Sequence, residues 1–147
     1  RAVSHLEDFL DDTAFQEIIP DHHEFEKPER VNRVIFCTGK VYYDLLAYRE
    51  ENDIKHAAIV RVEQIYPLDS EGIKMAVSPY SSAKKFIWCQ EEPLNMGAWS
   101  FMQPRLERIT KSRVRYAGRE RASSPSTGSK AVHKREQKSL VKRAFSA

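Results

Sequence analysis

The segment "RVIFCTGKVYYDLLAYREEN", residues 33–52, decides the fold of this chain. It opens with the uninterrupted apolar run "VIFC", which is typical of a strand that is covered on both faces. The turn "CTGK" comes next, and Thr38 is the N-cap that we predict for the helix after it. The residues that follow recur at the spacing of one helical face: Val41, Leu45 and Tyr48, with Tyr42 and Leu46 alongside. The segment therefore predicts a strand, a turn and a helix in succession.

The same pattern repeats along the chain in three more strand-like runs: 57–62, 85–90 and 113–118. Helix-length segments separate them. The first is capped near Asp69 or Ser70, and the second, around 97–110, is shortened or kinked by Pro104. Strands that alternate with helices in this way predict right-handed βαβ crossovers. We therefore predict an α/β fold with three α/β/α layers and a mainly parallel sheet of about five strands.

The two ends of the chain differ in character. Residues 1–30 are weakly patterned, and "AFQEIIP" (14–20) is their one strand-like run. We predict that residues 1–30 form a connecting segment with an edge strand and that residues 31–147 form the α/β domain. A last helix is predicted over 129–145, docked through Leu140, Val141, Ala144 and Phe145. Its basic residues are predicted to lie mostly in solvent: Lys134, Arg135, Lys138, Lys142 and Arg143.

The net charge of +3 conceals an uneven distribution of acidic and basic residues along the chain. Residues 1–30 hold nine acids and three bases, whereas residues 101–147 hold thirteen bases and three acids. The basic residues alternate with apolar ones and no aromatic stacking motif accompanies them, so we expect a protein or an anionic effector, and no nucleic acid, on this surface. No apolar run approaches the roughly 20 residues of a membrane span. We expect a soluble globular domain and, because the sequence starts at Arg1 with no signal-peptide pattern, a piece of a longer chain.

The cysteines and histidines do not predict a metal or redox site. Cys37 and Cys89 each lie inside an apolar run, with neither CxxC nor zinc-ligand spacing, so we predict reduced, buried thiols in a reducing compartment. The histidines have no HxH or HExxH spacing and no partnered Cys or Ser nearby: His5, His22, His23, His56 and His133. Neither a metal site nor a catalytic triad is expected.

Ligands of open parallel sheets gather at the carboxyl ends of the strands. The loops at those ends are "CTGK", "EQIYP", "QEEPLNMG" and "GRERASSPS". "CTGK" leads into a helix N-terminus, where backbone N–H groups and Lys40 could hold an anion. The loop lacks the GxxxxGK[ST] cradle of a phosphate loop, so plain turn chemistry is the favoured interpretation.

The stretch "WCQEEPLNMGAW" (88–99) is the strongest candidate for chemistry. Glu91 and Glu92 could form an acid/base pair, because adjacent carboxylates raise each other's pKa. Neighbours in an extended chain point in opposite directions, which favours structural roles instead. These are anions at the start of the next helix, salt bridges to the basic half of the chain, or capping of that helix by Asn95. Trp88 and Trp99 are predicted to be core aromatics.

Five ordered blocks carry a resemblance to a known family: "VIFCTGKVYYDLL", "AIVRVEQIYPL", "FIWCQEEPLNMGAW", "RYAGRERASSPSTGS" and "VHKREQKSLVKRAF". Together they resemble the C-terminal domain of the 2-oxoglutarate dehydrogenase first component, a thiamine-diphosphate-dependent decarboxylase. The stretch "AVSHLEDFLDDTAFQEIIPD" (2–21) looks like the segment that joins this domain to the preceding one. The resemblance therefore covers nearly the whole chain.

The resemblance implies a transketolase C-terminal-like domain whose first strand is an antiparallel edge. In the family the complete chain uses thiamine diphosphate and Mg²⁺ to decarboxylate 2-oxoglutarate, and it passes the succinyl group to the dihydrolipoyl succinyltransferase component. The Gly-Asp-Gly and Asn-Asn motif and the catalytic histidines of those enzymes do not occur here, so no catalytic or cofactor-binding residue is expected and the chain alone is expected to be inactive. Such a domain helps to build the homodimer and to buttress the cofactor domains. The location implied is the cytoplasm of a bacterium or the mitochondrial matrix of a eukaryote.

Some family members bind an acyl-CoA or adenylate effector. Their site includes the "EQ" of "VEQIYP", here Glu63 and Gln64, but "LDSEGIK" follows where an effector phosphate would need Arg. Only Gln64 carries over as an effector contact. The family motif is matched by Glu91, Glu92, Asn95, Gly97 and Trp99, whereas Met96 stands where family members usually have Gln. The alternative from another class is a stand-alone adenylate or acyl-CoA-binding module that uses "CTGK" and the basic half.

Overall fold

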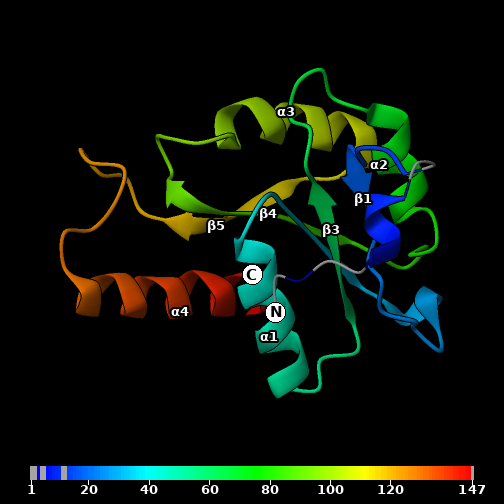
Figure 1. Cartoon of the computed structure of the whole chain (residues 1–147), viewed down its shortest axis with the longest axis horizontal. Helices are drawn as coiled ribbons and strands as arrows, with labels where there is room; N and C mark the ends of the chain where they lie inside the picture. The colour runs from blue at the N-terminus through cyan, green and yellow to red at the C-terminus, as the bar shows by residue number, and fades with distance from the viewer. Residues whose placement is uncertain (1–2, 4–5, 11–12, 147) are drawn as a thin grey trace.

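The chain folds into one five-stranded mixed sheet with helices on both faces (Figure 1). The computed structural model describes residues 3, 6–10 and 13–146. The strands are β1 (Ile18–Ile19), β2 (Arg33–Cys37), β3 (Ala57–Val62), β4 (Lys85–Pro93) and β5 (Val114–Arg119). The helices are α1 (Val41–Glu51), α2 (Ser70–Val77), α3 (Trp99–Thr110) and α4 (Lys130–Ser146), with the short 3₁₀ helices η1 (Leu6–Phe9) and η2 (Pro28–Arg30).

The strand order is β1-β3-β2-β4-β5, with β2 at the centre. β2 pairs in parallel with β3 on one side and with β4 on the other, and β4 pairs in parallel with β5. β1 pairs antiparallel with β3, so that Ile18 lies opposite Val62. The predicted mainly parallel sheet with an antiparallel edge strand is confirmed. β1 is shorter than the predicted run, and Pro20, which has no N–H to continue the ladder, follows its last residue.

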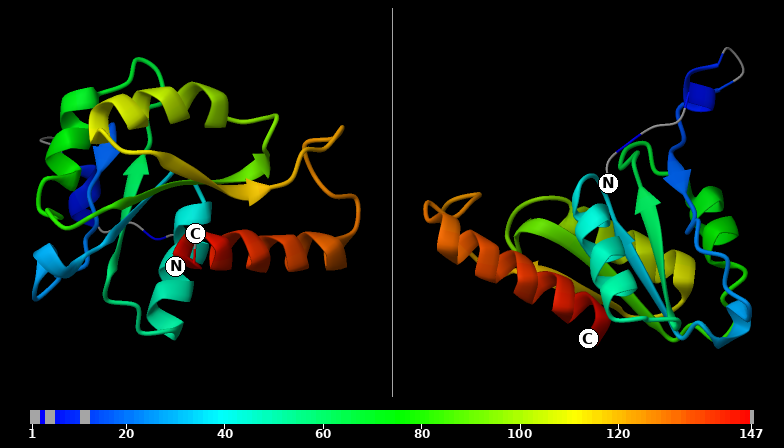
Figure 2. Two further views of the ribbon diagram at one scale, coloured as in Figure 1. Left: turned by 180° about the vertical axis from the view of Figure 1, so that it is seen from behind. Right: turned by 60° about the horizontal axis from the view of Figure 1, so that its bottom comes forward.

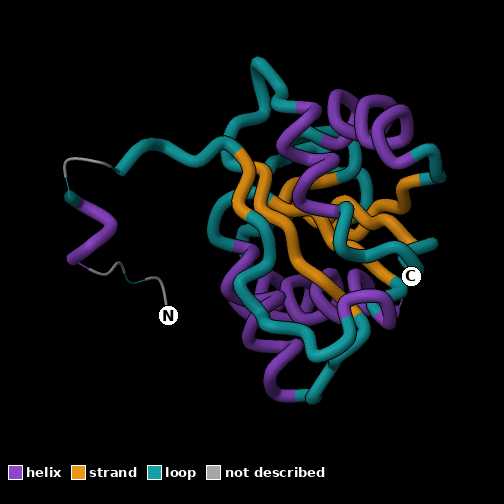
Figure 3. The backbone as a smooth tube through the Cα atoms, turned by 90° about the vertical axis from the view of Figure 1, so that its right-hand side faces the viewer, coloured by secondary structure: helices purple, strands orange, loops and turns teal. Residues whose placement is uncertain are grey.

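The three predicted layers are confirmed by how the strands distribute their side chains. Val34 and Phe36 of β2 join the core under α2 and α3, whereas Ile35 and Cys37 join the core under α1 and α4. Figure 2 shows α1 and α4 together on one side of the sheet and α2 and α3 on the other. In Figure 3 the strands form the middle layer between these helices. Because both faces are covered, the central strands carry apolar residues without alternation.

Two predictions about the helices need correction, the cap of α1 and the effect of Pro104 on α3. Thr38 does not cap α1: the residue before the helix is Lys40, without a side-chain cap, because a turn with Gly39 at φ +66° separates Thr38 from the first helical residue. Pro104 does not shorten α3, which runs unbroken to Thr110. Pro104 has no N–H to donate to the carbonyl of Ser100, four residues earlier. Ser100 is exposed, so its carbonyl can bond to water instead. The cap of α2 is confirmed, because Asp69 Oδ1 accepts a hydrogen bond from Gly72 N at 2.9 Å.

The last helix docks as predicted. Its buried residues are Leu140, Val141, Ala144 and Phe145, and its lysines are exposed, while Arg143 is half-buried. Cys37 and Cys89 are free and buried, as predicted. Burial raises the pKa of the Cys89 thiol to about 12 and raises that of Cys37 as well, so both are un-ionised near neutral pH. No helix within the described part of the chain is long and apolar enough to cross a membrane.

A buried ion pair joins Asp21, in the acidic segment over 1–30, to the rest of the domain. The carboxylate of Asp21 is fully buried and pairs with the guanidinium of Arg49 in α1, whose Nη2 donates to Oδ1 at 3.1 Å. Asp21 Oδ2 also accepts from Ile59 N in β3 at 2.7 Å. The carboxylate thus joins residues 20–23 to a helix and a strand of the domain. The proposed boundary at residue 30 stays a prediction.

We predict that Asp21→Ala lowers the free energy of unfolding by about 3 to 5 kcal/mol, because the substitution leaves the buried charge of Arg49 without its partner. Urea denaturation followed by circular dichroism measures the loss. Glu71→Ala is the matched control, since Glu71 pairs with Lys74 on the exposed surface of α2. The control is expected to change stability by about 0.5 kcal/mol or less, and equal losses for both variants would contradict the assignment.

Candidate functional site

β2 and β4 are neighbours in the sheet, and their carboxyl ends lie at its topological switch point. The chain leaves β2 for β3 on one side, and it leaves β4 for β5 on the other. This is the place where open parallel sheets have their crevice. The turn after β2 supplies Lys40 and the end of β4 supplies Glu91, and Lys40 Nζ donates to Glu91 Oε1 at 2.6 Å. Two of the predicted loops therefore come together here.

Helix α4 closes this crevice with the side chain of Gln137. Its Nε2 donates to Glu91 Oε1 at 2.9 Å and to Asp44 Oδ2 in α1 at 2.8 Å. Lys40 Nζ lies 3.9 Å from the same Asp44 oxygen. The lysine, the two carboxylates and the carboxamide form one network that joins α1, β4 and α4.

Arg119, at the end of β5, extends the network. Its Nη1 donates to the backbone carbonyl of Glu91 at 2.6 Å, and its Nη2 donates to Gln137 Oε1 at 3.1 Å. Its Nη2 also lies 3.0 Å from His133 Nδ1, which must be the acceptor because a guanidinium only donates. Its Nε forms an ion pair with Glu136 Oε2 at 3.1 Å. Both Nη groups are therefore hydrogen-bonded within the chain, whereas Nε faces Glu136 as an ion pair without a hydrogen bond.

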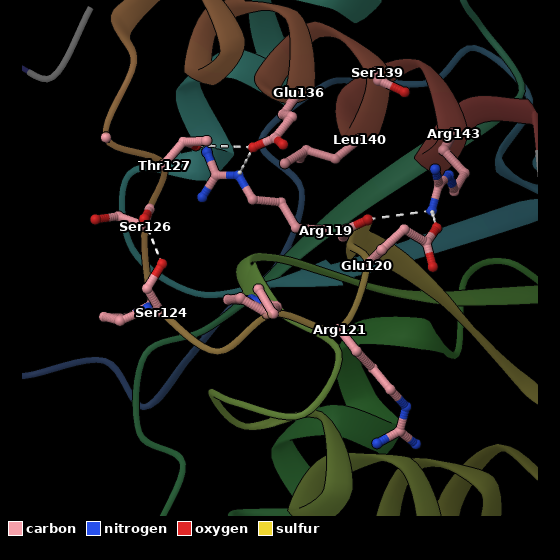
Figure 4. A pocket seen from close by; sticks show the side chains of 15 residues that line it. Arg119, Glu120, Arg121, Ser124, Ser126, Thr127, Glu136, Ser139, Leu140 and Arg143 are labelled. Carbon is pink, nitrogen blue, oxygen red and sulfur yellow. Dashed lines mark hydrogen bonds and ion pairs between the residues drawn. The ribbon is translucent and has the colours of Figure 1, made fainter.

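A cavity of about 310 Å³ lies beside Arg119, between the loop over 118–128 and α4 (Figure 4). On one side Glu136 accepts from Thr127 Oγ1 at 2.9 Å in addition to its pairing with Arg119. On the other side Arg143 Nη1 donates to Glu120 Oε1 at 3.0 Å. Figure 4 shows both pairs bridging the loop and the helix, whereas the side chain of Arg121 extends away from both. The cavity walls carry both signs of charge, mostly already paired.

The carboxamide of Gln90 organises the other side of the β4 end. Its Oε1 accepts from Trp88 Nε1 at 2.8 Å and from the backbone N–H of Trp99 at 3.0 Å, and its Nε2 donates to the carbonyl of Met96 at 2.7 Å. Gln90 is almost fully buried. A Cβ on Gly97, which has φ +66°, would lie 2.8 Å from Gln90 Nε2, so this turn requires glycine.

A bulge in β4 explains how the two glutamates point. Cys89 lies opposite Ala117 and Pro93 lies opposite Arg119, so β4 has two more residues than β5 over this stretch. The Tyr116 hydroxyl lies 2.8 Å from the carbonyls of both Glu92 and Arg119, and burial raises its pKa to about 12. The hydroxyl therefore stays protonated and donates a hydrogen bond between the two strands at the bulge.

Glu91 and Glu92 do not act as anions at the start of α3. Strand β4 continues through both residues to Pro93, so the turn over 94–98 separates them from the helix, whose first turn has no acid. The Glu91 carboxylate is bonded to Lys40 and Gln137, and Glu92 is exposed. They diverge as adjacent strand residues do. No bond between these two carboxylates is found in the described structure.

Capping of α3 by Asn95 is also wrong. The Asn95 side chain exchanges two hydrogen bonds with the backbone of Ala122, at 3.0 and 3.1 Å. The residue before α3 is Ala98, without a side-chain cap, and the first N–H of the helix is taken by Gln90 from the neighbouring strand. Sequence reasoning missed Gln90, although one polar residue that ends the apolar run "FIWCQ" was the available signal.

The remaining predicted site residues lie elsewhere. Gln64 donates to the Pro67 carbonyl at 3.0 Å, and Glu63 pairs with Arg61 Nε at 2.9 Å. Trp88 is fully buried and Trp99 packs partly buried against the same core, as predicted. Within the described ranges, no group of three His, Cys, Asp or Glu side chains could hold a metal ion. His5 lies outside the described residues.

Comparison with known proteins gives one consistent family. A family model described as "2-oxoglutarate dehydrogenase C-terminal" matches residues 3–145. The "2-oxoglutarate dehydrogenase E1 component" of Haemophilus influenzae is 44% identical over 99% of this chain and 16% of the relative. The "2-oxoglutarate dehydrogenase, mitochondrial" of Caenorhabditis elegans is 43% identical over 98% of this chain and 14% of the relative. The chain thus spans about a sixth of the length of the curated relatives it matches.

We predict that Gln90→Ala lowers the free energy of unfolding by about 2 to 4 kcal/mol, because the Trp88 indole N–H, the Trp99 N–H and the Met96 carbonyl all lose their bonded partner. Urea denaturation followed by tryptophan fluorescence measures this. Gln103→Ala is the control, since Gln103 makes only a 3.4 Å contact with Glu107 on the surface of α3. Losses of similar size in the two variants would contradict a large contribution of the Gln90 hydrogen bonds to stability.

Proposed function

The chain belongs to the family of 2-oxoglutarate dehydrogenase C-terminal domains, and from this we propose that it is the non-catalytic C-terminal domain of an E1 component. Its role is to help form the homodimer and to support the domains that carry out the reaction. Its relatives are enzymes of which it matches a small part, so the reaction is proposed to belong to the rest of such a chain.

The observation that carries this proposal is the network of paired polar groups at the carboxyl ends of β2, β4 and β5. Glu91 is bonded to both Lys40 and Gln137, and Arg119 is hydrogen-bonded to Glu91 and Gln137 and forms an ion pair with Glu136. These groups direct their hydrogen bonds and charges to partners within the chain. Here the charged groups stabilise the junction of three elements, which supports a structural role. Within this role Glu91, Glu92, Asn95, Gly97 and Trp99 are proposed as the structural motif of the domain.

The activity of the parent chain is proposed to be the thiamine-diphosphate-dependent decarboxylation of 2-oxoglutarate, an oxidoreductase step of the citric acid cycle. The diphosphate of that cofactor is held through Mg²⁺, which needs a set of oxygen ligands. Neither the Gly-Asp-Gly motif nor a carboxylate cluster of that kind is present in the described residues, so the residues of this domain do not fit the cofactor. No step of the reaction is assigned to them.

The partners proposed for the parent chain follow from the same family. They are a second copy of the chain, in a homodimer, and the dihydrolipoyl succinyltransferase component that receives the succinyl group. The proposed location is the cytoplasm for a bacterial source and the mitochondrial matrix for a eukaryotic one, in line with relatives of both kinds.

An effector contact at Gln64 stays a prediction. Its carboxamide already donates to Pro67, and the residues after it include the acids Asp69 and Glu71 rather than arginines. An effector phosphate would meet like charge there. Calorimetry with AMP and acetyl-CoA tests the alternative of a stand-alone adenylate or acyl-CoA module, and micromolar binding by the isolated chain would favour that alternative over the scaffold.

We predict no turnover when the purified chain is mixed with thiamine diphosphate, Mg²⁺, 2-oxoglutarate and an artificial electron acceptor. Circular dichroism in the same buffer shows that the chain is folded. Measurable 2-oxoglutarate-dependent reduction of the acceptor would overturn the proposal.

Glu91→Gln and Glu92→Gln provide a matched pair that separates scaffold from catalysis. Glu91→Gln is expected to lower stability by about 0.5 to 1 kcal/mol, because it loses the partly exposed ion pair with Lys40. Glu92→Gln is expected to be nearly neutral, since only the backbone carbonyl of Glu92 is bonded. An activity of the chain that either variant abolished would instead support the acid/base pair.

A further inference from the structure

A stripe of lysines runs along α4 at every fourth residue: Lys130, Lys134, Lys138 and Lys142. All four side chains are exposed, and none has an ion pair within the described part of the chain. Residues four apart are neighbours on a helix, and like charges at this spacing destabilise it. The single acid of the helix, Glu136, is already paired with Arg119. The stripe is therefore an uncompensated row of charge about 18 Å long.

A groove of about 370 Å³ runs beside the stripe, where α4 lies next to α1. Its apolar lining comes from Ala47, Tyr48 and Val141. Lys138 and Lys142 form its rim on the α4 side, and Asp44 and Glu51 form the rim on the α1 side. Figures 1 and 2 show the two helices on the same side of the sheet. The groove is therefore apolar at its floor, basic along one edge and acidic along the other.

We propose that this groove, which we call the α1–α4 groove, binds an amphipathic helix of a protein partner. Carboxylates at i and i+4 along one side of that helix meet the lysines of α4. Apolar side chains between them fill the floor at Ala47 and Tyr48. A basic residue on the opposite side meets Glu51. Opposite charges on the two rims fix the direction in which the helix lies, because the reversed orientation places like charges together.

The charge of the α1 rim favours a protein helix over other anionic partners. A nucleic-acid backbone or an anionic membrane carries one sign of charge, so Glu51 would repel it while the lysines attract it. A membrane surface also needs a projecting apolar face, whereas the apolar face of α4 is buried in the core through residues such as Leu140 and Phe145. A helix with acids on one side and bases on the other satisfies both rims.

The test uses a labelled synthetic peptide of about five helical turns, with Glu at every fourth position on one side, Lys on the other side and Leu between. Its binding to the chain is followed by fluorescence anisotropy. Lys138→Glu/Lys142→Glu is expected to weaken binding at least about tenfold. Ala47→Phe, which fills the floor without a charge change, is expected to weaken it as well. Circular dichroism checks that both variants fold.

Lys27→Glu/Lys84→Glu is the matched control, because it makes the same change in net charge at exposed lysines outside the groove. It is expected to leave binding unchanged. Equal loss in the two double variants would reduce the effect to net charge and overturn the proposal. So would unchanged binding by Lys138→Glu/Lys142→Glu, or no binding to the wild type. Tighter, stripe-dependent binding of a single-stranded oligonucleotide or of phosphatidylserine vesicles would replace the protein helix by that partner.

Discussion

The buried carboxamide of Gln90 is the interaction on which the functional end of the domain depends. A carboxamide inside an apolar core is tolerated only when its oxygen and nitrogen are both bonded. Gln90 meets this requirement with Trp88 in its own strand, the first N–H of α3 and the Met96 carbonyl. These bonds fix where α3 begins and pull the turn before it so close that Gly97 cannot carry a side chain. The same turn carries Asn95, whose side chain donates a hydrogen bond to the carbonyl of Ala122.

Burial on both faces explains why the neighbouring polar groups form a closed network. β2 and β4 are covered by helices on each side, so polar side chains appear only at their ends, where α1 and α4 come close. The ion pair of Lys40 and Glu91 is partly exposed, at 69% and 23% of the two side chains, and contributes about 1 kcal/mol or less. Arg119 is only 9% exposed and bonds from the end of β5 to both β4 and α4, so it dominates the junction.

Much of the fold was predictable because local patterns dominate it. The run over 57–62 matches β3 to the residue, the apolar run "VIFC" lies within β2, and 3.6-residue periodicity identified the four docked residues of α4. The errors arose where distant residues override local preference. Asn95 has the side chain of a good cap, yet Gln90 occupies that role from a strand nine residues earlier. Glu91 and Glu92 are typical loop residues, yet a bulge closed by Tyr116 keeps them in β4. The pairing of Asp21 with Arg49 spans 28 residues and leaves no local pattern to read.

Amide hydrogen exchange at Trp99 reports directly whether Gln90 holds the start of α3. The first N–H groups of a helix have no intrahelical acceptor, so protection of the Trp99 amide reports the bond to Gln90. Ser100 is the internal reference, because it is exposed and no acceptor for its backbone N–H is found among the described residues. We predict that Trp99 exchanges at least about a hundredfold more slowly than Ser100, after correction for intrinsic rates. Exchange of the two amides at the same corrected rate would contradict the role given to Gln90.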